Sequence, residues 1–211
     1  MATQQAQSNI SEVSICNQAL SWVGAGQINS LDEPSRAAEW CRNNYPFLRD
    51  AVMEERMWTF AVDRTVSTVA DTPEWGDGIY AHPYPLEWLA VYRVYRSPDK
   101  RPQDQVHEWV REGDNILAGE STIYMWGIKR VVDTGKFSNL FVQALAARMA
   151  ADMAIPFAEN RSLQVDLWNL YQSKLDIAAV RDGQQGRNEI IQSDTLINAR
   201  ARTTGLIGDY R

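Results

Sequence analysis

Apolar residues at every third or fourth position dominate the beginning of the chain, a spacing that is typical of amphipathic helices. The pattern predicts a short helix over residues 11–23, which ends at a pair of glycines. A second helical pattern covers residues 34–52 and begins at a proline that suits the first turn of a helix. Pro46 lies inside this pattern, so we expect either two helices that meet near Tyr45 or one kinked helix.

Strand-like patterns follow the second helix. Residues 58–69 and 88–95 are rich in valine, threonine and aromatic side chains, which favour extended structure. Similar stretches lie at 106–110 and 122–132, and the gaps between them are too short for the crossovers that parallel strands need. These stretches predict a small antiparallel sheet, and the proline and glycine residues of 71–85 predict turns.

Helical periodicity returns near residue 137, and two patterns with a short connection predict an antiparallel helix pair. From residue 183 the chain is polar and offers little apolar surface to bury. We therefore predict an α+β fold, mainly α: a bundle of about four helices, an inserted small antiparallel β region and an extended C-terminal arm. The expected divisions are one domain over 1–182 (helices over 11–56 and 137–180, β-rich insertion over 58–133) and a flexible arm over 183–211.

The composition is that of a globular protein, with 45% hydrophobic and 23% charged residues. The formal net charge of -6 has the wrong sign for a protein that grips nucleic acid through its phosphates. The first residues lack the basic start and apolar core of a signal peptide, and no uninterrupted apolar run of about 18 residues predicts a membrane span. We expect a soluble protein without membrane contact.

Few residues offer catalytic chemistry. The two histidines, His82 and His107, belong to no metal-binding spacing, and the glycine-rich turns follow helices where a phosphate-binding loop would precede one. We interpret Cys16 and Cys41 as buried thiols of a protein made in a reducing compartment. Carboxylate pairs could serve glycoside hydrolysis, but adjacent acids on a helix point in different directions. We predict no catalytic residue, no cofactor and no metal.

Two regions are candidates for protein contacts. The chain has eight tryptophans and eight tyrosines, and exposed aromatic residues more often mark protein interfaces than sugar platforms. We therefore predict a partner-facing surface in the β region. Its candidate residues are Trp75, Tyr80, Trp88, Trp109 and Trp126.

The polar C-terminal segment contains apolar pairs and arginines, a composition that suits folding onto a partner. The alternative is a frayed tail without a binding role. The candidate residues of the arm are Arg187, Ile190, Ile191, Leu196, Ile197, Arg200, Arg202, Leu206, Ile207 and Arg211.

A series of landmark residues occurs in a characteristic order. Before the β region they are Asn17, Ala19, Leu20, Trp22, Val23, Gly24, Ile28, Ser30, Leu31, Ala38, Cys41, Tyr45, Arg49, Asp50, Trp58, Thr59, Phe60 and Ala61. Further on they are Tyr84, Pro85, Phe137, Phe141, Met149, Ala150, Met153, Ala154, Leu170, Tyr171, Leu175 and Ala178. The series resembles that of the phage tail tubular protein A family over most of residues 10–182. Two methionines, Met149 and Met153, stand where leucine is usual, a change that conserves volume.

Members of this family are head-to-tail adaptors of short-tailed phages, and the resemblance implies a structural protein that is not an enzyme. It implies a dodecameric ring between the portal protein and the tail nozzle or next tail protein. The ring would continue the DNA channel for genome retention and ejection, and double-stranded DNA would pass through the lumen without specific binding. The arm would reach along the portal, and the β region would face the tail.

The resemblance also implies where the protein resides: in the virion, at the head-to-tail interface, and in the host cytoplasm during assembly. A negatively charged lining would let DNA slide, which agrees with the net charge. Two alternatives remain: a tail-associated protein that binds or hydrolyses polysaccharide, and a head-completion connector of another tail type.

Overall fold

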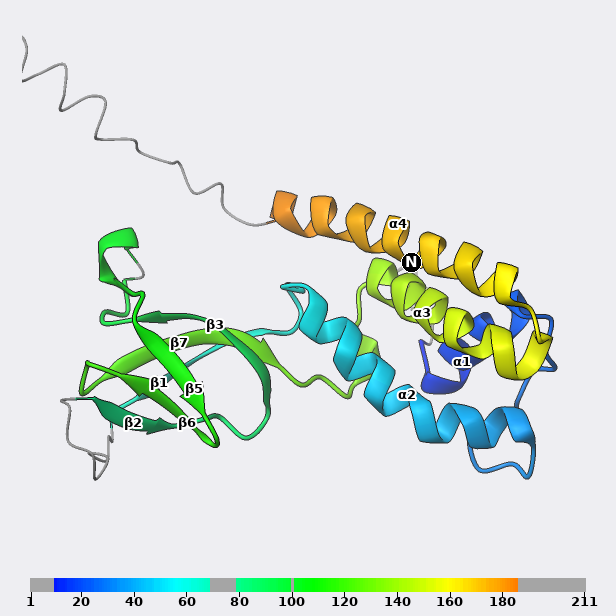
Figure 1. The fold of residues 1–211 in the computed structure, drawn as a ribbon, viewed down its shortest axis with the longest axis horizontal. Coiled ribbons are helices and arrows are strands. Elements are labelled where there is room, and N and C mark those ends of the chain that lie inside the picture. Colours follow the sequence, from blue (N-terminus) through cyan, green and yellow to red (C-terminus); the bar gives the residue numbers. More distant parts are fainter. Residues whose placement is uncertain (1–9, 69–78, 100, 186–211) are drawn as a thin grey trace, which may run out of the picture.

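The computed structural model describes residues 10–68, 79–99 and 101–185, which form a helical half and a β half placed end to end (Figure 1). The helices are α1 (Glu12–Trp22), α2 (Arg36–Glu55), α3 (Asn139–Ala158) and α4 (Arg161–Gln185). The strands are β1 (Val62–Ser67), β2 (Tyr80–Pro83), β3 (Trp88–Tyr95), β4 (Gln105–Val106), β5 (Trp109–Glu112), β6 (Asn115–Ala118) and β7 (Ile123–Lys129). The predicted class, α+β and mainly α, is confirmed.

Serine side chains fix where three of these helices begin. The Ser11 hydroxyl accepts a hydrogen bond from the Ser14 backbone N–H, and the Ser14 hydroxyl accepts one from the Ser11 backbone N–H. The Ser35 hydroxyl accepts a hydrogen bond from the Ala38 N–H at the start of α2, and the Ser138 hydroxyl accepts one from the Phe141 N–H at the start of α3. Each cap satisfies a backbone donor that the first helical turn leaves without a partner.

The α2 helix continues through Pro46 as one element, and Figure 1 shows it changing direction partway along its length. Of the two alternatives left by the sequence, the kinked helix is therefore correct. Proline has no N–H to donate to the preceding turn and its ring crowds that turn, which bends the helix. A second proline, Pro156, lies in the last turn of α3. The helix continues past it and ends at Ala158.

The α3 helix is the centre of the helical half. It packs on α4, α1 and α2, and its buried residues are mainly alanine and methionine. A helix covered from several sides is apolar around most of its circumference. By length and composition α3 could also cross a membrane, although Gln143, Arg148 and Asp152 interrupt its apolar run.

The β half contains two antiparallel sheets in the described residues, where the sequence predicted one. Their strand orders are β1-β7-β3-β4 and β2-β6-β5. The stretch 106–110 is divided between them, because the chain leaves the first sheet after Val106 and enters the second at Trp109. Apolar residues of both sheets, including Val94, Ile116 and Met125, form a common core, and facing sheets bury more apolar surface than one sheet can.

Candidate functional site

The predicted aromatic surface of the β region is not one exposed patch. Trp88 is only 7% exposed and belongs to the core between the two sheets, so its predicted role in facing a partner is wrong. Trp109 is half-buried against the same core, and Tyr80 is half-buried on β2. Trp75 lies outside the described residues. Trp126 is half-buried as well, and it alternates along β7 with the buried Met125, so it lies on the face of the sheet away from that core.

Trp126 lies between two arginines on the outer face of the four-stranded sheet. Arg64 of β1 and Arg93 of β3 are its cross-strand neighbours, and their guanidinium carbons lie 5.9 and 5.2 Å from the centroid of the indole ring. These distances are within the range of cation–π interactions. A pocket of about 390 Å³ adjoins this group. Because two guanidinium groups already lie against the indole, less of its face is open to a sugar ring.

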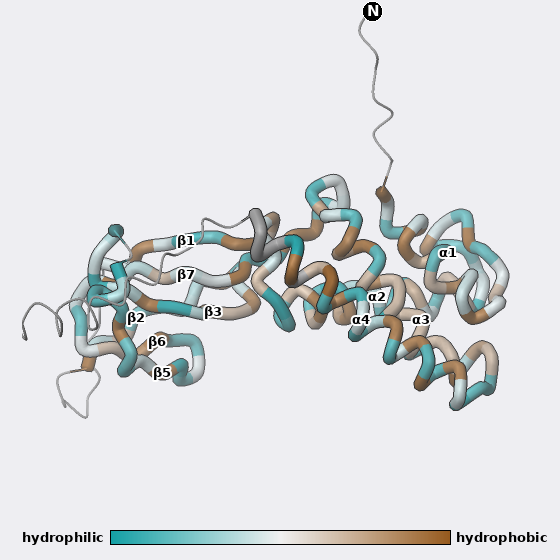
Figure 2. Tube along the Cα trace, turned by 90° about the horizontal axis from the view of Figure 1, so that it is seen from above, coloured by the Kyte–Doolittle hydropathy of each residue, from teal (hydrophilic) through white to brown (hydrophobic). Residues whose placement is uncertain are grey.

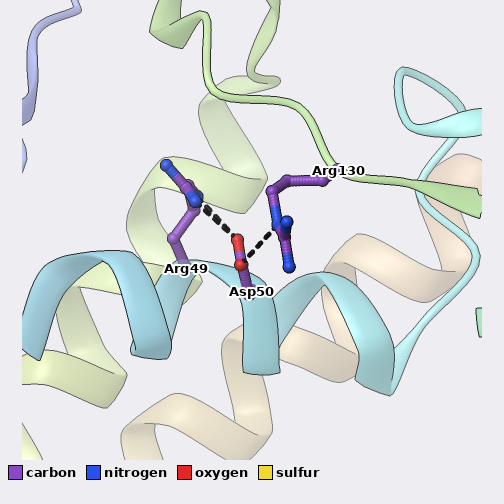
Figure 3. Close-up of polar contacts among 3 residues, drawn as sticks. All are labelled: Arg49, Asp50 and Arg130. Atoms are coloured by element: carbon purple, nitrogen blue, oxygen red, sulfur yellow. Dashed lines mark hydrogen bonds and ion pairs between the residues drawn. The ribbon is translucent and has the colours of Figure 1, made fainter. Parts of the chain in front are cut away.

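A hydrogen-bonded junction joins the helical half to the β half (Figure 3). The Asp50 carboxylate of α2 accepts hydrogen bonds from Arg49 Nε and Arg130 Nε, each at 2.8 Å. Arg130 directly follows β7, so one carboxylate connects a helix to the end of a strand. The Arg49 side chain is only 7% exposed, and a buried charge is tolerated when an opposite charge pairs with it.

Further contacts fix the same junction. The Tyr92 hydroxyl of β3 donates to the Glu54 carbonyl oxygen of α2 at 2.7 Å. The Trp58 indole N–H donates to the Val52 carbonyl oxygen at 2.8 Å, and this bond holds the chain as it leaves α2. We conclude that the β half has a defined orientation on α2.

The two crossings of the chain between the halves lie together. The Lys129 backbone N–H donates to the Ala61 carbonyl oxygen at 2.8 Å, and the rings of Phe60 and Phe137 are 5.6 Å apart. The insertion thus begins and ends at one place, which allows the helices before and after it to pack together.

Large apolar residues are exposed on three of the described helices: α2, α4 and, at Ile155, α3. Phe47 of α2 is 76% exposed, and Leu170, Ile177 and Val180 are exposed on α4. This surface was not predicted from the sequence. The sequence did contain an indication of it. Leu170, Ile177 and Val180 lie outside the stripe of α4 that packs into the core, which consists of Leu167, Tyr171, Leu175 and Ala178.

The groups with possible chemistry have structural partners. Cys16 and Cys41 are free and fully buried, as expected. The hydrogen bond to Cys41 and its own burial raise the pKa of the Cys16 thiol, whereas the same hydrogen bond lowers the pKa of the Cys41 thiol, which is buried away from solvent. The buried His82 ring contacts Ser67 Oγ at 3.1 Å and the Glu120 carbonyl oxygen at 2.8 Å. In the described part of the chain, no group of three or more His, Cys, Asp or Glu residues is placed to hold a metal ion.

The candidate residues of the arm, from Arg187 to Arg211, lie outside the described residues. The predicted start of the arm at residue 183 needs correction, because α4 continues to Gln185. Residues 181–185 are mostly polar, but a helix needs no apolar side chains to add one more turn to an existing one.

Comparison with known proteins gives no assignment. The chain matches no family model, and no curated protein matches it.

Proposed function

We propose that this protein is a structural head-to-tail adaptor of a short-tailed phage and has no enzymatic activity. Twelve copies form a ring between the portal protein and the tail nozzle or next tail protein, and DNA passes through the lumen without specific binding. The order of landmark residues suggests this function. The observation that carries it is a set of exposed apolar side chains on α2 and α4: Phe47 on α2, and Leu170, Ile177 and Val180 on α4.

The two helices that carry these side chains, α2 and α4, lie on either side of α3 (Figure 1). In the view from above, the labels of α2, α3 and α4 fall together, in agreement with this stacking (Figure 2). A closed ring uses two different, complementary faces of each copy, whereas a symmetric dimer uses one face twice. Exposed apolar residues on two different helices therefore suit a ring.

The landmark residues of the resemblance also shape the fold. The Asn17 side chain accepts from the Ile28 backbone N–H and donates to the Ile28 carbonyl oxygen, both at 2.8 Å. The rings of Trp58 and Phe141 pack at 5.0 Å where the two halves meet. Because these residues set a loop and the junction, a shared order of landmarks supports a shared architecture.

The fixed junction between α2 and the β half supports different roles for the two halves in the ring. In the proposed ring the helical halves form the wall and the β halves project towards the tail. The hydrogen bonds that Arg130 and Tyr92 donate to α2 would hold every projection at the same angle, as a regular docking platform requires.

The test is the mass and negative-stain image of the purified full-length protein, alone and after mixing with isolated portal rings of the phage that encodes it. We expect a twelve-fold ring attached to the portal. Protein that stays monomeric and does not bind the portal would overturn the proposal. Release of sugar from capsular or cell-wall polysaccharide, abolished by substitution of one carboxylate, would favour the polysaccharide alternative.

A further inference from the structure

We infer that the α4 face of one copy binds the α2 face of the next copy, with the two helices parallel and in one defined register. This inference rests on the proposed ring and names the surfaces that would close it. The α4 face consists of Asp166, Leu170, Ser173, Ile177, Val180 and Arg181, and the α2 face consists of Arg36, Asn43, Phe47 and Glu54; all ten are exposed.

The apolar centre of each face is solvent-exposed in the single chain. On α4, Leu170, Ile177 and Val180 follow at intervals of seven and three residues, which places them on one side of the helix. Leu167 and Tyr171 point towards the core instead. On α2, Phe47 lies on the side opposite the buried Cys41 and Tyr45. Each copy thus offers an apolar stripe on α4 and a protruding aromatic ring on α2.

The direction of the helices favours a parallel contact. Figure 1 shows α2 and α4 running in the same direction, with α3 antiparallel between them. Neighbours in a ring of twelve differ by a rotation of only about 30°. The α4 helix of one copy and the α2 helix of the next therefore remain close to parallel.

Charged residues at the two ends of each face favour the parallel direction of the two helices. The α2 face begins with Arg36 and ends with Glu54, whereas the α4 face begins with Asp166 and ends with Arg181. In a parallel contact unlike charges meet at both ends. In an antiparallel contact Arg36 would meet Arg181 and Glu54 would meet Asp166, and these like charges would repel.

The spacing of charge and apolar centre agrees between the two faces. Phe47 follows Arg36 by eleven residues, and Ile177 follows Asp166 by eleven residues. At about 1.5 Å per residue, both intervals are about 16 Å along the path of the helix, and on α2 this path includes the bend at Pro46. One register therefore places Phe47 on Ile177 and Arg36 beside Asp166, and it brings Glu54 within a helical turn of Arg181. The Arg36 guanidinium is held in place by the Pro156 carbonyl oxygen at 2.7 Å and by the Phe157 ring.

Disulfide trapping in the full-length protein tests the contact. The double variant Phe47→Cys/Ile177→Cys is assembled on portal rings and oxidised with oxidised glutathione. We expect a ladder of covalent multimers on non-reducing gels. The matched control is Phe47→Cys/Val165→Cys, because Val165 is 54% exposed and Ile177 is 52% exposed on the same helix, but Val165 lies on a different side. The control should give no ladder.

The outcomes separate this inference from the proposed function. Rings of normal appearance without a ladder, or equal ladders for both pairs, would overturn the inference and leave the adaptor proposal standing. Failure of the unsubstituted protein to form any ring would overturn both.

A charge exchange tests the register without cysteines. Asp166→Arg should abolish ring formation or reduce it at least about tenfold, and adding Arg36→Asp should restore it. A double variant that assembles no better than Asp166→Arg would contradict the register. Both positions are exposed, and circular dichroism checks that each variant is folded.

Discussion

Gly127 of β7 shows how a single residue sets the shape of the β half. A Cβ atom at this position would overlap the Ala90 carbonyl oxygen and lie 2.7 Å from two ring carbons of Trp88. Gly127→Ala should therefore lower the free energy of unfolding by about 2 kcal/mol or more, as measured by urea denaturation. The control is Gly119→Ala, where the added Cβ meets nothing within 4 Å and a change below about 0.5 kcal/mol is expected. Equal losses for both variants would contradict this account.

A pH effect is expected at Asp152 of α3. Burial raises the pKa of its carboxyl group, and the attraction of Arg148, whose Nε lies 3.4 Å from Oδ2, opposes this only in part. The folded state thus holds the proton more tightly than the unfolded state, so stability falls as pH rises from the ordinary aspartate pKa through the raised one. At pH 7 Asp152→Asn should be more stable than the natural protein, by less than about 1 kcal/mol.

Urea midpoints at a series of pH values measure this effect. The gain of Asp152→Asn should disappear below about pH 3.9, where the carboxyl group is protonated in both states. Asp32→Asn, the same substitution at an exposed position, is the control. An Asp152→Asn variant that is less stable at pH 7 would mean that the attraction of Arg148 outweighs the effect of burial.

The burial of single residues was predictable only in the helices. Cys16 and Cys41 fall on clear apolar stripes, and both are buried as predicted. Trp88 begins a strand with apolar residues on both faces, so alternation does not show which side meets a core. Its side depends on the second sheet and on the irregular pairing of β3 with β7, which are not visible in the local sequence.

At the scale of elements, Asp50 determines how α2 holds the β half. Asp50→Ala would leave the buried Arg49 guanidinium without its carboxylate and should lower the free energy of unfolding by about 2–4 kcal/mol. Arg130→Ala removes the other partner, whose side chain is 46% exposed, and should cost less than about 1 kcal/mol. Chemical denaturation compares the two variants. A larger loss for Arg130→Ala would show that the junction depends on the strand side of the contact.

The helices could be predicted from the sequence, but the pairing of the strands could not. The helices follow from local periodicity, and serine caps mark three of their beginnings. Pairing of strands is non-local, so the division of 106–110 between two sheets could not be derived from neighbouring residues. The exposed surfaces of α2 and α4 could not be predicted either, because only the packing of these helices decides that Phe47 and Ile177 stay exposed.

At the scale of the whole molecule, the arm and the folded part should be separable. The described helices and sheets have their own cores within residues 10–185. A chain that ends at Gln185 should therefore keep the helical circular dichroism signal and the urea midpoint of the full chain. In our proposal it should fail to attach to DNA-filled heads, as a head-binding assay would show. Loss of soluble folding would place the arm in the core, and normal attachment would remove its proposed role.

The central claim is the closed ring, and the most direct measurement is a cryo-electron microscopy reconstruction of the full-length protein bound to portal rings, made without imposed symmetry. We predict twelve copies with their helical halves in the wall, α4 of each copy against α2 of the next, and the β halves projecting away from the portal. Portal rings without added density, or copies that contact each other through their β halves alone, would contradict the account.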